Sequence, residues 1–139
     1  PVQDKTTVYL GDTMGELMRL YGTADAAFVG GSLVPVGGHN LLEPAILGVP
    51  VLSGPELANF SDVAEVLRSA DALVDVSDAE ALGEAVSALL VAPDERRRRG
   101  EAAKAAVMAQ RGALVRTLAG LAKLLPGDAE TPLPDGVNH

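Results

Sequence analysis

The stretch that decides the fold is GGSLVPVGGHNLLEP, residues 30–44. The apolar run Ala26–Val29 precedes it, and a short run of this kind is typical of a buried parallel strand. A helix is predicted to follow, roughly Leu42–Leu47, and Gly48 and Pro50 end it. The four glycines between strand and helix leave room for a ligand close to the main chain. The helix N-terminus that comes next suits a phosphate.

Two residues at the end of this loop allow a purely structural interpretation. Asn40 could cap the helix, with Glu43 reaching back as in a capping box. Pro44 favours Glu43 itself as the cap, because proline prefers the first helical position and restricts the residue before it. For Glu43 a capping role and a ligand role both stay open. His39 is one of two histidines, and a single histidine is more often structural than a ligand residue.

Composition excludes several classes of function. The 139 residues suffice for one domain, and 47% of them are hydrophobic, which indicates a globular chain. The net charge of −8 argues against wrapping nucleic acid and against lying on an anionic membrane. With no cysteine and two histidines, no metal site of the thiolate or histidine-rich kind is expected. No apolar run approaches the ~20 residues that span a bilayer.

Along the chain, apolar runs and helical periodicity alternate. Capping residues are expected at Thr13 with Glu16, at Ser61, and at Ser77 with Glu80. Gly112 is expected to divide the last helical stretch in two. The predicted strands are Thr7–Leu10, Ala26–Val29, Val49–Leu52 and Ala72–Val76, and the predicted helices are Met14–Tyr21, Leu42–Leu47, Ser61–Ala70, Leu82–Leu90, Asp94–Gln110 and Ala113–Leu125.

The run Arg96–Arg99 is a second place where a phosphate could bind. Acidic residues flank it at Asp94, Glu95 and Glu101. A helix face on which opposite charges pair in solvent explains such a run without a ligand. We therefore favour the structural interpretation of the arginines.

Strand followed by helix, repeated, predicts a parallel sheet that helices cover on both faces. In such sheets ligands bind beyond the carboxyl ends of the strands. Three loops leave the predicted sheet at that edge: Asp12–Met14, Gly30–Glu43 and Ser53–Phe60. We expect them to converge on one site.

Several motifs resemble one family. These are LGDTMGEL at residues 10–17, FVGGSL at 28–33, GGHN with LEP at 37–44, and PVLSGP at 50–55. In this combination and spacing they resemble the C-terminal half of 3-deoxy-D-manno-octulosonic acid (Kdo) transferases. The resemblance is dense over residues 8–60 and loose over 61–125. It implies a Rossmann-like α/β fold, as the C-terminal domain of a two-domain GT-B glycosyltransferase.

The resemblance also implies a chemistry. The family is inverting, needs no metal and no further cofactor, and transfers Kdo from CMP-Kdo to a lipid A precursor. Its C-terminal half holds the donor: the first glycines and Ser32 approach phosphate and sugar, residues 38–40 hold the phosphate, Glu43 takes the ribose hydroxyls, and residues 10–14 line the cytosine. No catalytic residue is expected in this chain. The donor-binding residues implied are Leu10, Gly11, Asp12, Met14, Gly30, Gly31, Ser32, Gly37, Gly38, His39, Asn40 and Glu43.

By the same resemblance, the chain is expected to be part of a longer protein. Residues 1–125 would be the donor-binding domain and 126–139 a disordered tail. The acceptor site, the catalytic base and the membrane contact would belong to an N-terminal half, at the cytoplasmic face of the bacterial inner membrane, with the fragment itself soluble. Two alternatives stay open: an inactive nucleotide-binding or docking module, and another sugar-nucleotide enzyme such as an N-acetylglucosaminyltransferase or an epimerase.

A final expectation concerns the sheet. In Rossmann-like order, 3-2-1-4-5-6, the third and fourth strands are not neighbours. If Thr7–Leu10 is the third strand, both it and Ala26–Val29 lack a neighbour. We expect residues 5–10 to pair with Ala26–Val29 or with a second copy of the chain, since an apolar edge seeks a partner. The later strands should form a parallel core.

Overall fold

The computed structural model describes residues 5–12 and 14–124, with side chains through Ala119. Its contacts divide the chain into two units, residues 1–109 and 110–139, and the last helix has residues in both. In order, the elements are α1 (Leu17–Tyr21), β1 (Ala27–Phe28), α2 (Leu42–Ile46), β2 (Val51–Ser53), the 3-10 helix η1 (Ala58–Phe60), α3 (Ser61–Ser69), β3 (Leu73–Asp75), α4 (Ala79–Leu90) and α5 (Pro93–Leu124).

The sheet has the order β1-β2-β3, and both pairings are parallel. Ala27 lies opposite Val51, and Leu52 lies opposite Val74. Sequential parallel strands need crossover connections, and α2 and α3 supply them. The predicted parallel core of three strands is therefore confirmed, with each strand shorter than its apolar run.

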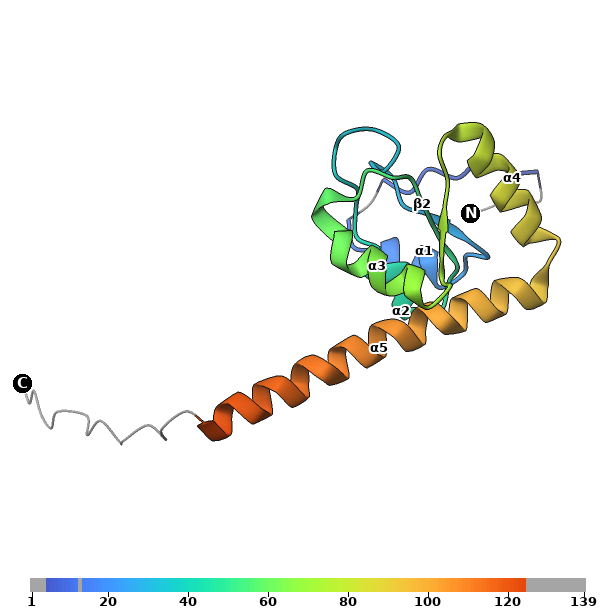
Figure 1. Cartoon of the computed structure of the whole chain (residues 1–139). Helices are drawn as coiled ribbons and strands as arrows, with labels where there is room; N and C mark the ends of the chain where they lie inside the picture. The colour runs from blue at the N-terminus through green and yellow to red at the C-terminus, as the bar shows by residue number, and fades with distance from the viewer. Residues whose placement is uncertain (1–4, 13, 125–139) are drawn as a thin grey trace, which may run out of the picture. The chain divides into compact units, whose positions relative to one another are not determined.

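Helices cover both faces of the sheet, as predicted (Figure 1). Val51 and Leu73 belong to one buried cluster, together with residues of α2, α3 and the first part of α5. Leu52 and Val74 point the other way and pack with α4. Alternation along each strand thus sends successive side chains into two separate cores. The observed architecture is the Rossmann-like α/β arrangement expected.

The first predicted strand, Thr7–Leu10, is wrong. Residues 5–10 form no strand, and the side chains of Val8 and Leu10 are 83% and 80% exposed. A strand is stable only beside a neighbour, and within the described residues β1 pairs with β2 alone. Gly11, directly after this segment, instead lies against α1: a methyl group there would lie 3.0 Å from Leu20 Cδ1. Pairing of residues 5–10 with β1 is thus excluded, and pairing with a second copy stays a prediction.

The first helix is shorter than predicted. α1 begins at Leu17 rather than Met14, whose side chain is 99% exposed. Gly15 has φ of 86°, in the left-handed region, so the backbone cannot be helical there. The predicted capping box involves Thr13, which lies outside the described residues, so it stays a prediction.

Two other helix starts differ from the predicted caps. Ser61 is the first residue of α3, not its cap, because η1 leads directly into the helix. At α4 the cap is Asp78 rather than Ser77: its carboxylate accepts the Ala81 N–H at 2.8 Å, and Ser77 Oγ donates to it at 2.8 Å. The bond from Ala81 and then that from Ser77 lower the pKa of Asp78.

The last helical stretch begins where it was predicted to, but it is a single helix rather than two. α5 begins at Pro93, the position that suits proline, and continues through Gly112 to Leu124. The predicted break at Gly112 is wrong, because one glycine costs a helix only about 1 kcal/mol and good helix formers surround it. The predicted tail, 126–139, lies outside the described residues. Within the described residues, no helix is long and apolar enough to cross a membrane.

Candidate functional site

The loops that follow β1 and β2 are joined through Ser32. Its hydroxyl donates to Val29 O at 2.6 Å and accepts the Gly54 N–H at 2.9 Å. Its carbonyl accepts the Glu56 N–H at 2.9 Å. Ser32 is fully buried, so these bonds replace the ones that water would have made. The two loops form one body at the carboxyl edge of the sheet, as two of the three converging loops were predicted to do.

The contact between these loops depends on glycine. A methyl group at Gly54 would lie 2.2 Å from Ser32 O, closer than any real contact. At Gly38 it would lie 2.7 Å from Leu57 Cδ2, and at Gly37 2.6 Å from Asn59 Nδ2. Gly37 and Gly38 also have positive φ, 95° and 72°. The glycines at 37 and 38 therefore serve the packing of loop on loop.

The first pair of glycines is different, because it borders an exposed side chain. Gly38 N–H donates to Gly31 O at 2.9 Å, which closes the loop and brings His39 back to its start. A methyl group at Gly31 would lie 3.2 Å from both His39 Cδ2 and Nε2. His39 is exposed, and its ring lies beside Gly30 and Gly31. Main chain and imidazole are thus accessible together at this point.

Asn40 is hydrogen-bonded both to the start of α2 and to Glu43. Asn40 Oδ1 accepts the Leu42 N–H at 2.9 Å, and Asn40 Nδ2 donates to Glu43 Oε1 at 3.3 Å. The N-cap position of α2 is Leu41, whose side chain makes no capping bond. Neither predicted residue occupies that position, but part of the predicted scheme is present, because Asn40 accepts the first N–H of α2 and is bonded to Glu43. Pro44 lies in the first turn, where its missing N–H would have had no partner within the helix.

Tyr21 is a neighbour of the site that the sequence did not single out as a site residue. It ends α1, which packs on α2, and it is half-buried. Burial, and then the negative charge of Glu43, raise the pKa of the Tyr21 phenol. The sequence signal was only a place on the apolar face of a helix, so the contact between α1 and α2 was needed to find it.

The third predicted loop differs from the other two because its described residues are exposed. Leu10, Gly11, Asp12 and Met14 are all exposed. Gly11 lies against Leu20 of α1, as described above. The structure thus brings Gly30–Glu43 together with Ser53–Phe60, while residues 10–12 and Met14 are exposed to solvent. Their role at the cytosine stays a prediction.

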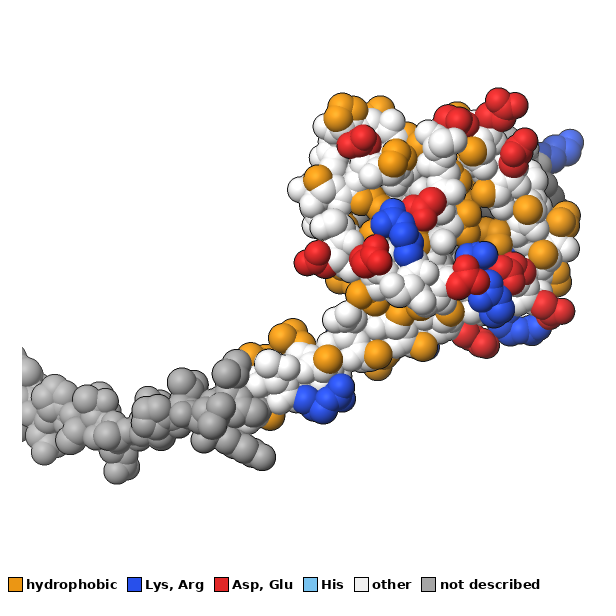
Figure 2. Space-filling model, in the orientation of Figure 1, with side chains coloured by type: hydrophobic (Ala, Val, Ile, Leu, Met, Phe, Trp, Pro, Cys, Tyr) orange, Lys and Arg blue, Asp and Glu red, His pale blue; other side chains and the backbone are white. Residues whose placement is uncertain are grey.

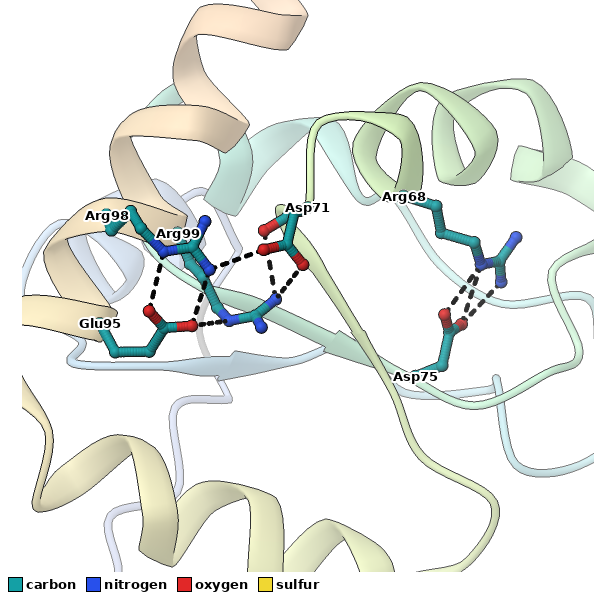
Figure 3. A network of polar contacts seen from close by, with 6 residues as sticks. All are labelled: Arg68, Asp71, Asp75, Glu95, Arg98 and Arg99. Carbon is teal, nitrogen blue, oxygen red and sulfur yellow. Dashed lines mark hydrogen bonds and ion pairs between the residues drawn. The ribbon is translucent and has the colours of Figure 1, made fainter.

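All four arginines of the run form ion pairs, and Figure 3 shows those of Arg98 and Arg99. Arg98 contacts Glu95 and Asp71, each at 2.7 Å, and Arg99 contacts the same two carboxylates at 2.7 and 3.3 Å. Arg97 pairs with Asp94, and Arg96 pairs with Asp25 at 3.3 Å. On the face drawn in Figure 2, basic and acidic side chains lie side by side over the start of α5. The structural interpretation of the run is confirmed.

The hydrogen bond from Arg98 and then that from Arg99 lower the pKa of Glu95 to about 2, from an ordinary value of 4.5. Asp71 has φ of 52°, so the ion pairs form at a left-handed turn between α3 and β3. The network ties the start of α5 to this turn.

A parallel sheet covered on both faces, with a glycine-rich loop at its carboxyl edge, defines a Rossmann-like domain of the kind found in GT-B glycosyltransferases. Residues 1–106 match the family described as Glycosyl transferases group 1. The chain belongs to this family.

Relatives agree with that assignment. The 3-deoxy-D-manno-octulosonic acid transferase of Haemophilus influenzae is 47% identical over 116 residues, 83% of this chain and 27% of the relative. The enzyme of the same name from Bordetella pertussis is 42% identical over 111 residues, 80% of this chain and 26% of the relative. The chain therefore spans about a quarter of the length of these curated relatives.

A solved structure is also similar. The C-terminal CMP-Kdo binding domain of WaaA from Acinetobacter baumannii aligns with a TM-score of 0.70 and 37% identity. The match covers 73% of this chain and 53% of that domain. The expected resemblance to Kdo transferases is confirmed by these similarities.

Proposed function

We propose that this chain is the donor-binding part of a Kdo transferase. The whole protein would transfer Kdo from CMP-Kdo to a lipid A precursor in lipopolysaccharide biosynthesis, by an inverting, metal-independent reaction at the cytoplasmic face of the inner membrane. The observation that carries the proposal is the similarity to a CMP-Kdo binding domain, at 37% identity and a TM-score of 0.70. The acceptor and the catalytic base are assigned to parts of the protein outside these 139 residues.

Within the site, the half-buried main chain at Gly30 and Gly31 and the adjacent exposed His39 are proposed to hold the phosphate of CMP. α2 has only five residues, so its dipole is small and the loop N–H groups are the main donors. Glu43 is proposed to accept hydrogen bonds from the ribose hydroxyls, since a carboxylate has two acceptor oxygens for a diol. Ser32 acts indirectly, because its hydroxyl is buried and already bonded.

The alternatives stated from the sequence are less favoured. Another sugar-nucleotide enzyme, an N-acetylglucosaminyltransferase or an epimerase, would be expected to resemble proteins of those names, whereas both relatives described above are Kdo transferases. A module without activity is compatible with the same site, and separate assays of binding and transfer distinguish it.

The test is a titration of this chain with CMP, UMP and a UDP-sugar, followed by amide NMR. We expect CMP to shift amides of residues 30–40 and 10–14, and UDP-sugars to shift them less. Shifts confined to the helix around Arg96–Arg99 would overturn the site. Shifts at residues 30–40 alone would sustain the phosphate site and remove residues 10–14 from it.

His39→Ala provides a second test, because the side chain is exposed and the fold does not depend on it. We expect CMP affinity to fall roughly tenfold, the loss of one hydrogen bond to a charged group, with the thermal midpoint unchanged. Arg97→Ala is the matched control, because Arg97 is exposed and its partner, Asp94, lies on the same helix. An equal effect of both variants would contradict the assignment.

A further inference from the structure

Both the oxygen and the nitrogen of the Asn40 side-chain amide are hydrogen-bonded. Its oxygen accepts the Leu42 N–H at 2.9 Å, which fixes the orientation of the amide group. Because the oxygen must face that N–H, the nitrogen faces Glu43, and it donates to Oε1 at 3.3 Å. Asn40 is half-buried, so the arrangement is partly shielded from water. The residue therefore links the start of α2 to the Glu43 carboxylate.

We propose that Asn40 is a positioning residue, which orients Glu43 toward the ribose hydroxyls and does not itself bind the phosphate. The proposal rests on the proposed function, because it assigns the ribose to Glu43. It replaces the role that the family resemblance implied for Asn40, since Nδ2 would have to leave Glu43 in order to reach a phosphate.

The need for such an anchor follows from the glutamate side chain. Glu43 has three rotatable bonds and is only half-buried, so without a partner its carboxylate would sample many positions. Among the described residues, the hydrogen bond from Asn40 is the one that Glu43 accepts, and it uses Oε1. The second oxygen, Oε2, and the remaining lone pair of Oε1 are then directed together and available to a diol.

Tyr21 limits the carboxylate from another side. It belongs to α1, which packs on α2, and the charge of Glu43 contributes to the raised pKa of its phenol. The Glu43 carboxylate is thus bonded to the Asn40 amide, and its charge acts on the phenol at the end of α1. A ligand hydroxyl approaches an acceptor whose direction is already set, which reduces the entropy lost on binding.

The test uses Asn40→Ser and three ligands: CMP, cytidine and 2′-deoxy-CMP. A serine hydroxyl can still accept the Leu42 N–H, but it is too short to reach Glu43 and adds no charge beside a phosphate. We expect the variant to bind CMP and cytidine more weakly by the same factor, roughly tenfold. Its affinity for 2′-deoxy-CMP should change little, so the preference for CMP over 2′-deoxy-CMP should fall.

Glu43→Gln and the double variant complete the cycle. If Asn40 acts through Glu43, the double variant binds CMP hardly more weakly than either single variant. Additive losses would overturn the proposal, and so would an Asn40→Ser variant that loses CMP affinity but keeps cytidine affinity, because that pattern indicates a phosphate contact. A thermal midpoint within error of the wild type shows that each variant is folded, and Asn40→Ala, which also loses the turn, shows what loss of local structure does.

The outcomes also separate this inference from the proposed function. If the wild-type chain binds neither CMP nor cytidine, both fail. If the wild type binds CMP and the Asn40→Ser variant binds it equally well, the proposed function stands and the positioning role of Asn40 is wrong.

Discussion

The loop of residues 30–44 and the run Arg96–Arg99 are the two places where this sequence suggests a phosphate, and the structure treats them in opposite ways. In the run, each arginine is paired with a carboxylate, and Glu95 and Asp71 each serve two of them. In the loop, His39 is exposed beside Gly30 and Gly31, and Glu43 accepts a hydrogen bond from Asn40 with one of its two oxygens. The more charged segment is the one with less left to offer a ligand.

The difference teaches that a binding site is recognised by groups held in place and left open, not by the density of charge. The arginines pair with acidic side chains at the surface, where such ion pairs contribute little to stability. The loop gains its rigidity elsewhere, from buried contacts of Ser32 with Gly54 and Glu56. Four variants test this contrast.

Gly54→Ala is expected to have the largest effect. The new methyl group would meet the Ser32 carbonyl at 2.2 Å, and both are backbone that cannot move without separating the loops. We expect a loss of about 3 kcal/mol in the free energy of unfolding, measured by urea denaturation, since overpacking costs ~1–3 kcal/mol and this site is tighter than most.

Gly83→Ala is the matched control for that variant. Nothing lies within 4 Å of a methyl group there, and Gly83 is inside α4. Alanine should stabilise the protein by about 1 kcal/mol. Similar results for the two glycines would mean that the loops are not held together in solution as described.

Ser32→Ala should have the second largest effect, because it leaves the buried Gly54 N–H without its acceptor. We expect a loss of about 2 kcal/mol, within the range for an unsatisfied buried group. Ser53→Ala is the comparison: Ser53 is equally buried, but its hydroxyl only donates to the carbonyl of the next residue, at 3.0 Å. If Ser53→Ala proves the more damaging, Ser32 is not the link between the loops.

Asp71→Asn tests the charged region, and its effect should be smaller. Asparagine tolerates the left-handed turn as aspartate does, so the change removes only the ionic contacts with Arg98 and Arg99. We expect the thermal midpoint to fall by roughly 1–3 °C at low salt and less at high salt. CMP affinity should not change, and a marked loss would make the arginine network part of the site.

Glu95→Gln addresses the pH dependence and should have the smallest effect at neutral pH. Because folding lowers the pKa of Glu95 from 4.5 to about 2, its contribution is present above pH 4.5 and is lost as the pH falls toward 2. The urea midpoint of the variant should therefore decline less than that of the wild type between neutral pH and pH ~3. Glu101→Gln, on the same helix but outside the network, should decline as the wild type does.

Periodicity and loop chemistry predicted the order of elements from Ala26 onward and the faces of the sheet, because these follow from local patterns. They failed at two places, once for a nonlocal reason and once for a local one. Thr7–Leu10 has the composition of a strand but no neighbour among the described residues. Gly112 resembles a helix end, yet the residues on either side are good helix formers, and one glycine does not outweigh them.

At the site, the sequence identified the loop but not the different roles of the residues within it. Motif spacing cannot distinguish Gly54, which admits the Ser32 carbonyl, from Gly30, which leaves space beside His39. Nor can it show that Asn40 and Glu43 bond to each other, because the alternative of a capping box has the same spacing. The first distinction depends on a distance between segments far apart in the chain, and the second on side-chain geometry within one turn.

The position of Tyr21 beside Glu43 has an optical consequence. The chain contains two tyrosines and no tryptophan, and Tyr9 is 60% exposed in the segment that precedes α1. Tyrosine emission is therefore not masked by energy transfer to an indole. A ligand that draws the Glu43 carboxylate toward its hydroxyls changes the surroundings of one of the two fluorophores. The wild-type protein thus carries its own label, and a fluorimeter suffices to follow what happens at this carboxylate.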